Sequence, residues 1–231
     1  MILYNDIKKR GTKMIKRVCV YIFGVLILGL GIVLNTKTSL GVAAVNSVPY
    51  ALSQMTDLSL GNWTTLMYIV FMILQMIMYR HWNVKIVLQL PFSYVMGFII
   101  DFYNNVITIV PSHFYQSLLI LVIAIVFTAL GAYLVVSMDL VANPVDGMVN
   151  TISDLTHRDF GQVKWIFDCF MMIVTIVVTM SLTGKMIGIG LGTIVSAICV
   201  GKVIQIYSHF FGKKLKNIVQ ISQCESIQLQ K

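Results

Sequence analysis

Ionisable and polar residues gather in one stretch of an otherwise apolar sequence, between Asp139 and Asp168. Lys164 precedes Asp168 by four residues, so a helix would place both side chains on one face, where they can form an ion pair. Charged groups within apolar segments are costly in lipid and usually face protein or water. This spacing predicts either a structural salt bridge or a group that handles a substrate or a proton.

The same stretch contains a predicted short helix that begins at Asn143 and Pro144. Asn can cap the free amides of a helix start, and Pro suits the first helical position. One face of this helix is polar, with side chains at Asn143, Asp146, Asn150, Ser153, Asp154 and His157. An amphipathic segment of this kind fits a surface helix or a polar loop. It also fits a half-helix folded into the membrane, with its polar face along a water-filled space.

A similar stretch lies upstream, which indicates an internal duplication. From Gly31 to about residue 80 the two stretches match without gaps at a separation of 100 residues, as in Gly31 and Gly131 or Gly61 and Gly161. Polar positions match as well, since Asn46 lies opposite Asp146. Further along, the register shifts by four, so that Gly97 pairs with Gly201 and Tyr103 with Tyr207. We therefore expect two repeats of about 100 residues, 18–110 and 111–211.

The composition indicates an all-α polytopic membrane protein with a single membrane domain. The chain has 231 residues, of which 58% are hydrophobic and 11% are charged, against about 25% charged in soluble domains. The net charge of +8 does not indicate nucleic-acid binding, because the cations cluster at the two ends and in particular loops. That distribution is typical of proteins that follow the positive-inside rule.

Six apolar windows have the length of a membrane-spanning helix: 18–35, 62–79, 84–103, 115–137, 162–182 and 186–210. Two shorter segments, 41–56 and 141–156, could cross the membrane or re-enter it. With a cytoplasmic N-terminus and neither short segment crossing, most Lys and Arg residues lie inside and only Lys37 and Lys185 lie outside. Each repeat then has three crossings, so the halves insert in opposite directions, as in many secondary transporters and some channels.

The two ends of the chain are expected in the cytoplasm. Residues 1–17 form a basic arm that can contact anionic lipid, and residues 212–231 form a tail. Met14 is an alternative start, in which case residues 1–13 would be an upstream extension. We expect no cleavable signal peptide, because the first apolar run is followed by Thr-Lys-Thr and not by a small-residue cleavage site.

Neither the cysteines nor the histidines are spaced for a metal or redox centre, and we expect no metal and no cofactor. The sequence around Gly188 contains a GxGxG pattern, but no strand precedes it, so it does not indicate nucleotide binding. Gly188, Gly192 and Ser196 recur at four-residue spacing, which predicts close helix packing. Thr193, at a local backbone bend, could also line a cavity.

Several of these features together resemble the YczE/YyaS/YitT group of bacterial integral membrane proteins. The resemblance covers roughly residues 18–211 and rests on Asn143-Pro144, on Gly161 followed by Asp168, and on Gly192-Thr193 with Gly201. It implies a multi-pass protein of the bacterial cytoplasmic membrane without an assigned substrate. The group usually has Pro at the position of Lys202 and an acid at that of Gln205, so the resemblance implies no role for these two residues.

Three classes of function fit these patterns. The first is a small-solute transporter or channel with a polar cavity between inverted repeats, taking a cationic or neutral solute. The second is a non-transporting membrane partner that supports a biosynthetic or signalling complex. The expected protein partners are another membrane protein or a second copy of the chain in a homo-oligomer. An intramembrane enzyme ranks last, because no nucleophile is paired with a base. The predicted substrate-binding residues are Asn46, Asn143, Pro144, Asp146, Asn150, Asp168, Gly192 and Thr193.

Overall fold

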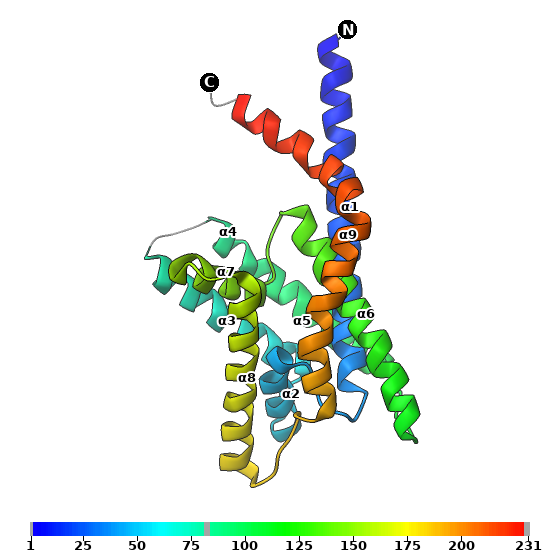
Figure 1. The fold of residues 1–231 in the computed structure, drawn as a ribbon, viewed down its shortest axis with the longest axis vertical. Helices are drawn as coiled ribbons and strands as arrows, with labels where there is room; N and C mark the ends of the chain where they lie inside the picture. Colours follow the sequence, from blue (N-terminus) through cyan, green and yellow to red (C-terminus); the bar gives the residue numbers. More distant parts are fainter. Residues whose placement is uncertain (1, 81–83, 229–231) are drawn as a thin grey trace.

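The computed structural model describes residues 2–80 and 84–228, which form helices and no strand. The helices are α1 (Ile2–Thr36), α2 (Ala44–Met55), α3 (Leu60–Tyr79), α4 (Val84–Val87), α5 (Gln89–Val106), α6 (Phe114–Met138), α7 (Pro144–Thr156), α8 (Phe160–Thr183) and α9 (Leu191–Gln228) (Figure 1). Side chains are described for residues 14–80 and 84–211. Most of the predicted basic arm, the predicted tail, His81 and Cys224 therefore lie outside the described side chains.

Six helical segments are long and apolar enough to cross a membrane, as predicted. They are Met14–Thr36, Leu60–Tyr79, Val84–Val106, Phe114–Met138, Phe160–Thr183 and Leu191–Phe211. Many large apolar side chains on their outer faces are exposed, and these faces contact the lipid bilayer. The chain is an all-α polytopic membrane protein with two further helices, α2 and α7, that are too short to cross it.

Polar contacts show which helix ends share a face of the bundle. At the upper face in Figure 1, Arg17 donates to the carbonyls of Met138 (2.6 Å) and Asp139 (2.9 Å), and Lys85 pairs with Asp139 at 3.6 Å. The start of the first span, the end of α6 and the start of α4 therefore meet there. At the lower face, Lys37 donates to the carbonyl of Asn104 at 3.3 Å, which joins the ends of α1 and α5.

The segment that contains α2 enters and leaves the bundle at the lower face. It begins at Lys37, beside the end of α5, and ends at Ser59, whose hydroxyl donates to Asp101 Oδ2 of α5 at 2.6 Å. The amide of Gly61 donates to the other oxygen of Asp101 at 2.7 Å. Both ends of the segment thus pack against the last two turns of one helix, so α2 is re-entrant.

The segment that contains α7 enters and leaves at the upper face. It begins at Asp139, which pairs with Lys85, and near its end Asp154 accepts a hydrogen bond from Tyr79 at 2.7 Å. Tyr79 and Lys85 flank the short connection between α3 and α4, so the two ends of the segment lie close to one another. The two short helices therefore re-enter from opposite faces of the bundle (Figure 1).

The helix bounds repeat along the chain with the predicted period. Helix α7 begins 100 residues after α2 (144 against 44), and α8 begins 100 residues after α3 (160 against 60). Where α1 and α6 cross, a Cβ on Gly31 would meet Thr128 and a Cβ on Gly131 would meet Leu28. Replacing each residue by its equivalent in the other repeat, 100 positions away, converts one contact into the other, as expected of a two-fold related interface.

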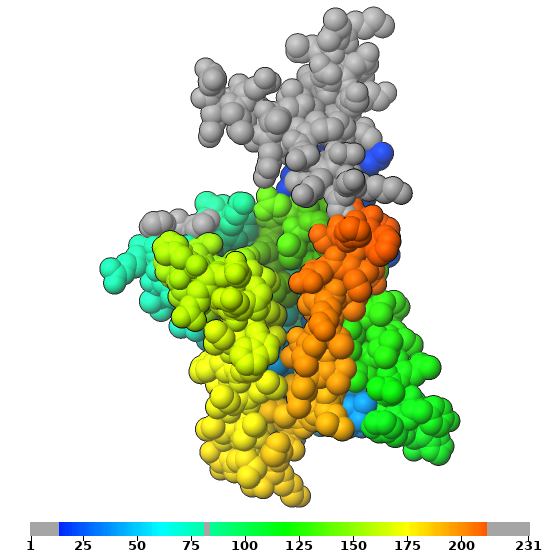
Figure 2. Space-filling model, viewed as in Figure 1, coloured from blue at the N-terminus to red at the C-terminus, as the bar shows by residue number. Residues whose placement is uncertain are grey.

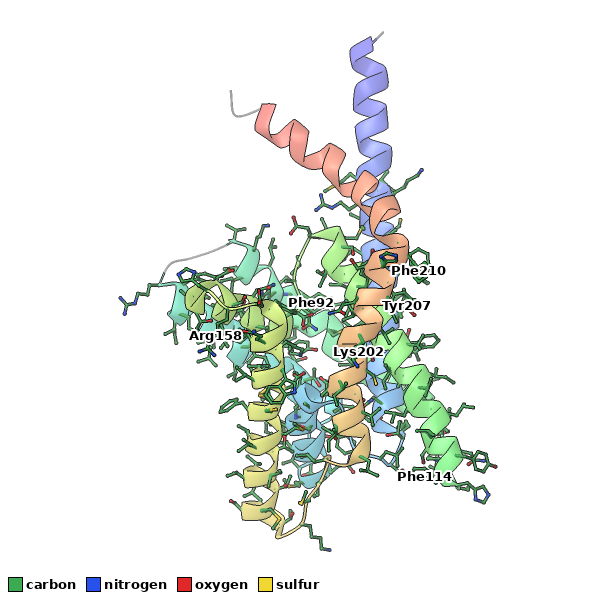
Figure 3. All side chains as sticks on the ribbon, in the orientation of Figure 1. Phe92, Phe114, Arg158, Lys202, Tyr207 and Phe210 are labelled. Atoms are coloured by element: carbon green, nitrogen blue, oxygen red, sulfur yellow. The ribbon has the colours of Figure 1, made fainter. Side chains whose placement is uncertain are left out.

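The expected span at 186–210 begins too early. Helix α9 starts at Leu191, because Gly188 has φ +82° and leaves the helical path. The amide of Val42 binds the carbonyl of Gly188 at 2.8 Å, and the amide of Gly192 binds the carbonyl of Leu40 at 2.7 Å. These contacts with the loop before α2 hold residues 184–190 in an irregular conformation. The direction of α9 is unaffected, and Phe210 lies at the end of the bundle opposite Phe114, the first residue of α6 (Figure 3).

Candidate functional site

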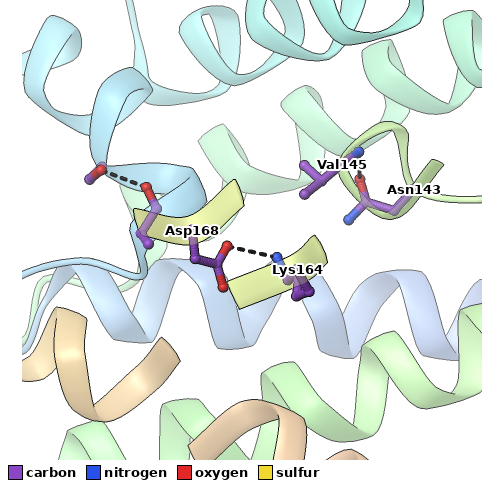
Figure 4. A network of polar contacts seen from close by, with 6 residues as sticks. Asn143, Val145, Lys164 and Asp168 are labelled. Atoms are coloured by element: carbon purple, nitrogen blue, oxygen red, sulfur yellow. Dashed lines mark hydrogen bonds and ion pairs between the residues drawn. The ribbon is translucent and has the colours of Figure 1, made fainter. Parts of the chain in front are cut away.

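An ion pair within α8 forms the centre of the site. Lys164 Nζ lies 2.9 Å from Asp168 Oδ1, at the predicted spacing of four residues (Figure 4). Asp168 is 6% exposed, whereas about a third of the Lys164 side chain reaches the surface, at 30%. An anion buried among apolar helices requires a partner of opposite charge, and Lys164 supplies it. Because the Lys164 side chain is partly exposed, it also connects the buried carboxylate to the surface of the bundle.

A second carboxylate, Asp146, lies close enough to both groups for electrostatic interaction. It is half-buried in the first turn of α7, and no hydrogen bond to another described residue is found for its side chain. Burial raises the pKa of the Asp146 carboxyl, as does the charge of Asp168, while the Lys164 ammonium opposes the shift. Two acids and one base therefore lie near one another between α7 and α8.

The start of α7 is held in place by several neutral groups. Asn143 Oδ1 accepts from the amide of Val145 at 3.3 Å, so Asn143 caps the helix as predicted, with Pro144 in the first turn (Figure 4). Gln75 of α3 donates to the carbonyl of Pro144 at 3.1 Å, and it exchanges two hydrogen bonds with Gln89 of α5. This buried amide pair fixes the depth at which α7 starts inside the bundle.

The start of α2 is held in a similar way on the other side of the bundle. Ser47 and Thr175 of α8 share a hydrogen bond of 2.6 Å. Asn35 accepts from the amide of Ala43 at 2.7 Å and donates to Ser196 of α9 at 3.0 Å. Asn46 is buried in α2, and no contact joins it to the ion pair.

Four of the eight predicted site residues lie in or next to the cluster, and the other four lie apart from it. Asp146 and Asp168 come together between α7 and α8, and Asn143 and Pro144 precede Asp146 at the start of α7. Asn46 is buried on α2 and Asn150 is exposed on α7. Gly192 and Thr193 pack against the loop that precedes α2. Thr193 is fully buried, accepts from the amide of Gly190 at 3.1 Å and donates to the carbonyl of Gly188 at 3.4 Å. These two residues hold a loop and lie apart from the acidic cluster.

Sequence reasoning passed over Tyr68 and Asn35. Tyr68 is fully enclosed on α3 and lies beside Asn143 and Asp146. Its position corresponds to Asp168 in the repeat register, which is the signal that could have found it. Asn35 is a lone amide at the end of an apolar span, and such residues in membrane helices usually bond to another helix. Among the described residues, no three His, Cys, Asp or Glu side chains converge as a metal site.

The model of a family of unknown function, DUF6198, matches residues 15–209. This range includes both re-entrant helices, four complete spans and all but the outermost one or two residues of the first and last spans. Neither a curated protein nor a solved structure matches the chain.

Proposed function

We propose that this chain, a member of the DUF6198 family, is a small-solute transporter whose binding site is the acidic cluster of Asp146, Lys164 and Asp168. The observation that carries the proposal is a cluster of three ionisable groups inside a membrane domain, in which Asp168 is buried and Asp146 and Lys164 are partly buried. Asp146 lies at the start of a re-entrant helix and the other two lie on α8. Ionisable groups at such depth are expensive and commonly mark the path of a substrate or ion. Two helices that re-enter from opposite faces fit the plan of inverted-repeat transporters.

The charge of the cluster favours a cationic or neutral solute. Two carboxylates and one ammonium sum to −1 when all three groups are ionised. A helix start can also attract anions through its free amides, but here Asn143 caps the first turn of α7 and Asp146 neutralises its dipole. An anionic solute would therefore meet a site of net negative charge.

The distribution of cations supports an orientation with both termini in the cytoplasm. Arg17 and Lys85 bind Asp139 at the upper face, and Arg158 lies just before the start of α8. Lys37 lies at the lower face. By the positive-inside rule, the upper face is cytoplasmic. The resemblance to the YczE/YyaS/YitT group supports a place in the bacterial cytoplasmic membrane.

A solute screen on purified protein tests the proposal. Small cationic and neutral solutes are added in detergent, and those that raise the apparent Tm are followed by uptake into proteoliposomes. We expect Asp168→Asn and Asp146→Asn to lose most of the uptake. Asp154→Asn is the matched control, because Asp154 lies on the same helix but bonds only to Tyr79 at the surface. Equal uptake by all three variants would refute the proposed site.

The same purification distinguishes the alternative class of function. A membrane partner of a biosynthetic or signalling complex would copurify at a fixed stoichiometry from native membranes. If such a partner appears and no solute raises the Tm, the transport proposal fails.

A further inference from the structure

The two repeats differ at one pair of equivalent interfaces. In the first repeat α3 packs against α5 along its length. A Cβ on Gly61 would overlap the carbonyl of Gly97, and a Cβ on Gly97 would overlap Thr65 Oγ1. Two backbones therefore touch directly, and the hydrogen bonds from Ser59 and Gly61 to Asp101 close the lower end of this interface. We call this contact the α3–α5 seal.

The corresponding interface in the second repeat is open. Helices α8 and α9 touch at few positions. Gly161 and Gly201, the repeat equivalents of Gly61 and Gly97, have no atom within 4 Å of an added Cβ. A shallow surface depression of about 480 Å³ lies on the start of α8, lined by Arg158, Gly161, Gln162, Trp165 and Ile166 and by no residue of α9. Figure 2 shows the yellow α8 and the orange α9 as separate columns with a furrow between them.

Polar residues on α9 lie unprotected beside this gap. Lys202 and Gln205 are both exposed although they lie within the span Leu191–Phe211 (Figure 3 labels Lys202). A charge and an amide facing hydrocarbon would be unfavourable, so the gap is better described as an aqueous opening. It lies on α8 one turn from Lys164, the partly exposed member of the acidic cluster.

The chain also carries the groups needed to close the open interface. In the repeat register, Ser59 corresponds to Asp159 and Asp101 to Gln205. If α9 closed on α8 as α5 closes on α3, Gln205 Oε1 could accept from the amide of Gly161 and its Nε2 could donate to Asp159. The first helical amides have no partner within the helix, so this exchange would give the amide of Gly161 an acceptor. Trp165, larger than Thr65, would then have to lie outside the closed interface, and 62% of it is already exposed.

We propose that the α3–α5 seal and the α8–α9 gap are two conformations of one repeated gate. In the second state of the protein, α8 and α9 close while α3 and α5 part, so that the acidic cluster opens to the lower face instead of the upper one. The structure is then the state open at the upper face. This inference rests on the proposed transport function and specifies its mechanism as alternating access through exchange of repeat conformations.

Paired cysteines on the full chain test the gate. In a background without the native cysteines, Asp159→Cys with Gln205→Cys reports closure of α8 on α9, and Ser59→Cys with Asp101→Cys reports the α3–α5 seal. Both pairs remove the polar groups at their interface, so they compare helix packing alone, and the direct contact of Gly61 with Gly97 still holds α3 against α5. Membrane vesicles are treated with a short bifunctional thiol reagent, and intramolecular links are identified by mass spectrometry. We expect rapid linking of the second pair and slower but measurable linking of the first.

Two further substitutions should move the equilibrium in opposite directions. Gly97→Leu overpacks the seal and should raise linking of residues 159 and 205 by about 5–30-fold. Overpacking costs free energy, and a cost of about 1–2 kcal/mol changes the ratio of the two conformations by this factor. Gly201→Leu fits the open gap and should abolish that linking. Should Gly97→Leu fail to fold, Asp101→Ala weakens the seal without added bulk and should act in the same direction.

The outcomes separate this inference from the proposed function. Absence of 159–205 linking in every background, or linking only between two chains, would overturn the gate, the latter because a second copy would then occupy the gap. Solute uptake without 159–205 linking would leave a transporter or channel that works in another way. Linking that responds to Gly97→Leu and Gly201→Leu, without uptake of any solute, would support the gate and refute the proposed transport function.

Discussion

At the scale of single residues, the acidic cluster depends on how Lys164 compensates two carboxylates. Asp168 is almost fully buried, and its one described partner is Lys164. Removing the base leaves two buried acids without a counter-charge, which is more costly than removing base and acid together. The ammonium is partly exposed, so solvent reduces the strength of the pair.

A double-mutant cycle should reveal this dependence. We expect Lys164→Met to lower the apparent Tm in detergent more than Lys164→Met combined with Asp168→Asn does. The coupling free energy should be ~0.5–3 kcal/mol, the range for residues in direct contact. Asp154→Asn combined with Lys164→Met provides the control, because these two residues make no direct contact and their effects should add. Additive effects for the first pair would mean that the ion pair contributes nothing measurable.

The raised pKa of Asp146 makes a prediction about pH. Burial disfavours the ionised Asp146 carboxyl in the folded state. Folding is therefore most favoured below the pKa of this group in the unfolded chain, about 3.9. The contribution is lost as the pH rises through the higher pKa of the folded state. Asp146→Asn should therefore raise the apparent Tm at pH 7, and the gain should shrink as the pH approaches 4. Thermal unfolding of the two proteins between pH 4 and 8 measures the effect. A gain that is the same at every pH would contradict this reasoning.

At the scale of the helices, glycines decide how closely two segments approach. At the crossing of α1 and α6, the backbone of Leu28 lies where a Cβ on Gly131 would be, whereas the space beside Gly161 is open. In the sequence, each of these glycines matches a glycine 100 positions earlier, and nothing in the neighbouring residues distinguishes the two. Whether a neighbour occupies the space is a property of the assembled bundle.

This difference gives a matched pair of substitutions. Gly131→Ala should destabilise the protein by about 1–3 kcal/mol, as overpacking does. Gly161→Ala should be neutral or stabilise it by up to about 1 kcal/mol, because Ala favours a helix and meets no neighbour. The apparent Tm and the yield of folded protein in detergent measure both variants. Equal losses at the two positions would mean that α8 is covered at Gly161.

The same distinction explains which parts of the fold the sequence predicts. The start of α7 follows from Asn143 and Pro144, and the Lys164–Asp168 pair follows from helical spacing, because both depend on residues close in the chain. The start of α9 was placed too early, since Gly188 leaves the helix to meet Val42, which lies far away in the sequence.

The cluster shows the same limit. Tyr68 belongs to it through a contact between α3 and α7, and in the sequence it is one aromatic residue within an apolar span. Thr193, at a local backbone bend, is predicted to line a cavity, but its hydroxyl instead forms hydrogen bonds with the backbone of Gly188 and Gly190 in the loop 184–190. Polarity alone does not distinguish a residue that binds a ligand from one that bonds to backbone.

At the scale of the whole molecule, the two halves must run in opposite directions through the membrane. Helices α2 and α7 re-enter from opposite faces, and each half contributes three spans. Because three is an odd number of crossings, the second half begins on the side opposite to the one on which the first half begins. Loops at equivalent positions of the repeats, such as those around Asp57 and His157, therefore lie on opposite sides. A parallel duplication would place them on the same side.

Thiol labelling in intact cells tests this arrangement. In a cysteine-free background, Asp57→Cys and His157→Cys offer exposed positions, and Asp57 avoids the Ser59–Asp101 hydrogen bond that closes the seal. By the positive-inside rule, we expect an impermeant reagent to label residue 57 in intact cells and residue 157 after permeabilisation. The reverse pattern would keep the inverted repeat but place the termini outside. Labelling of both residues from one side would mean that the halves are parallel, and a gate built from two inverted copies could not then operate.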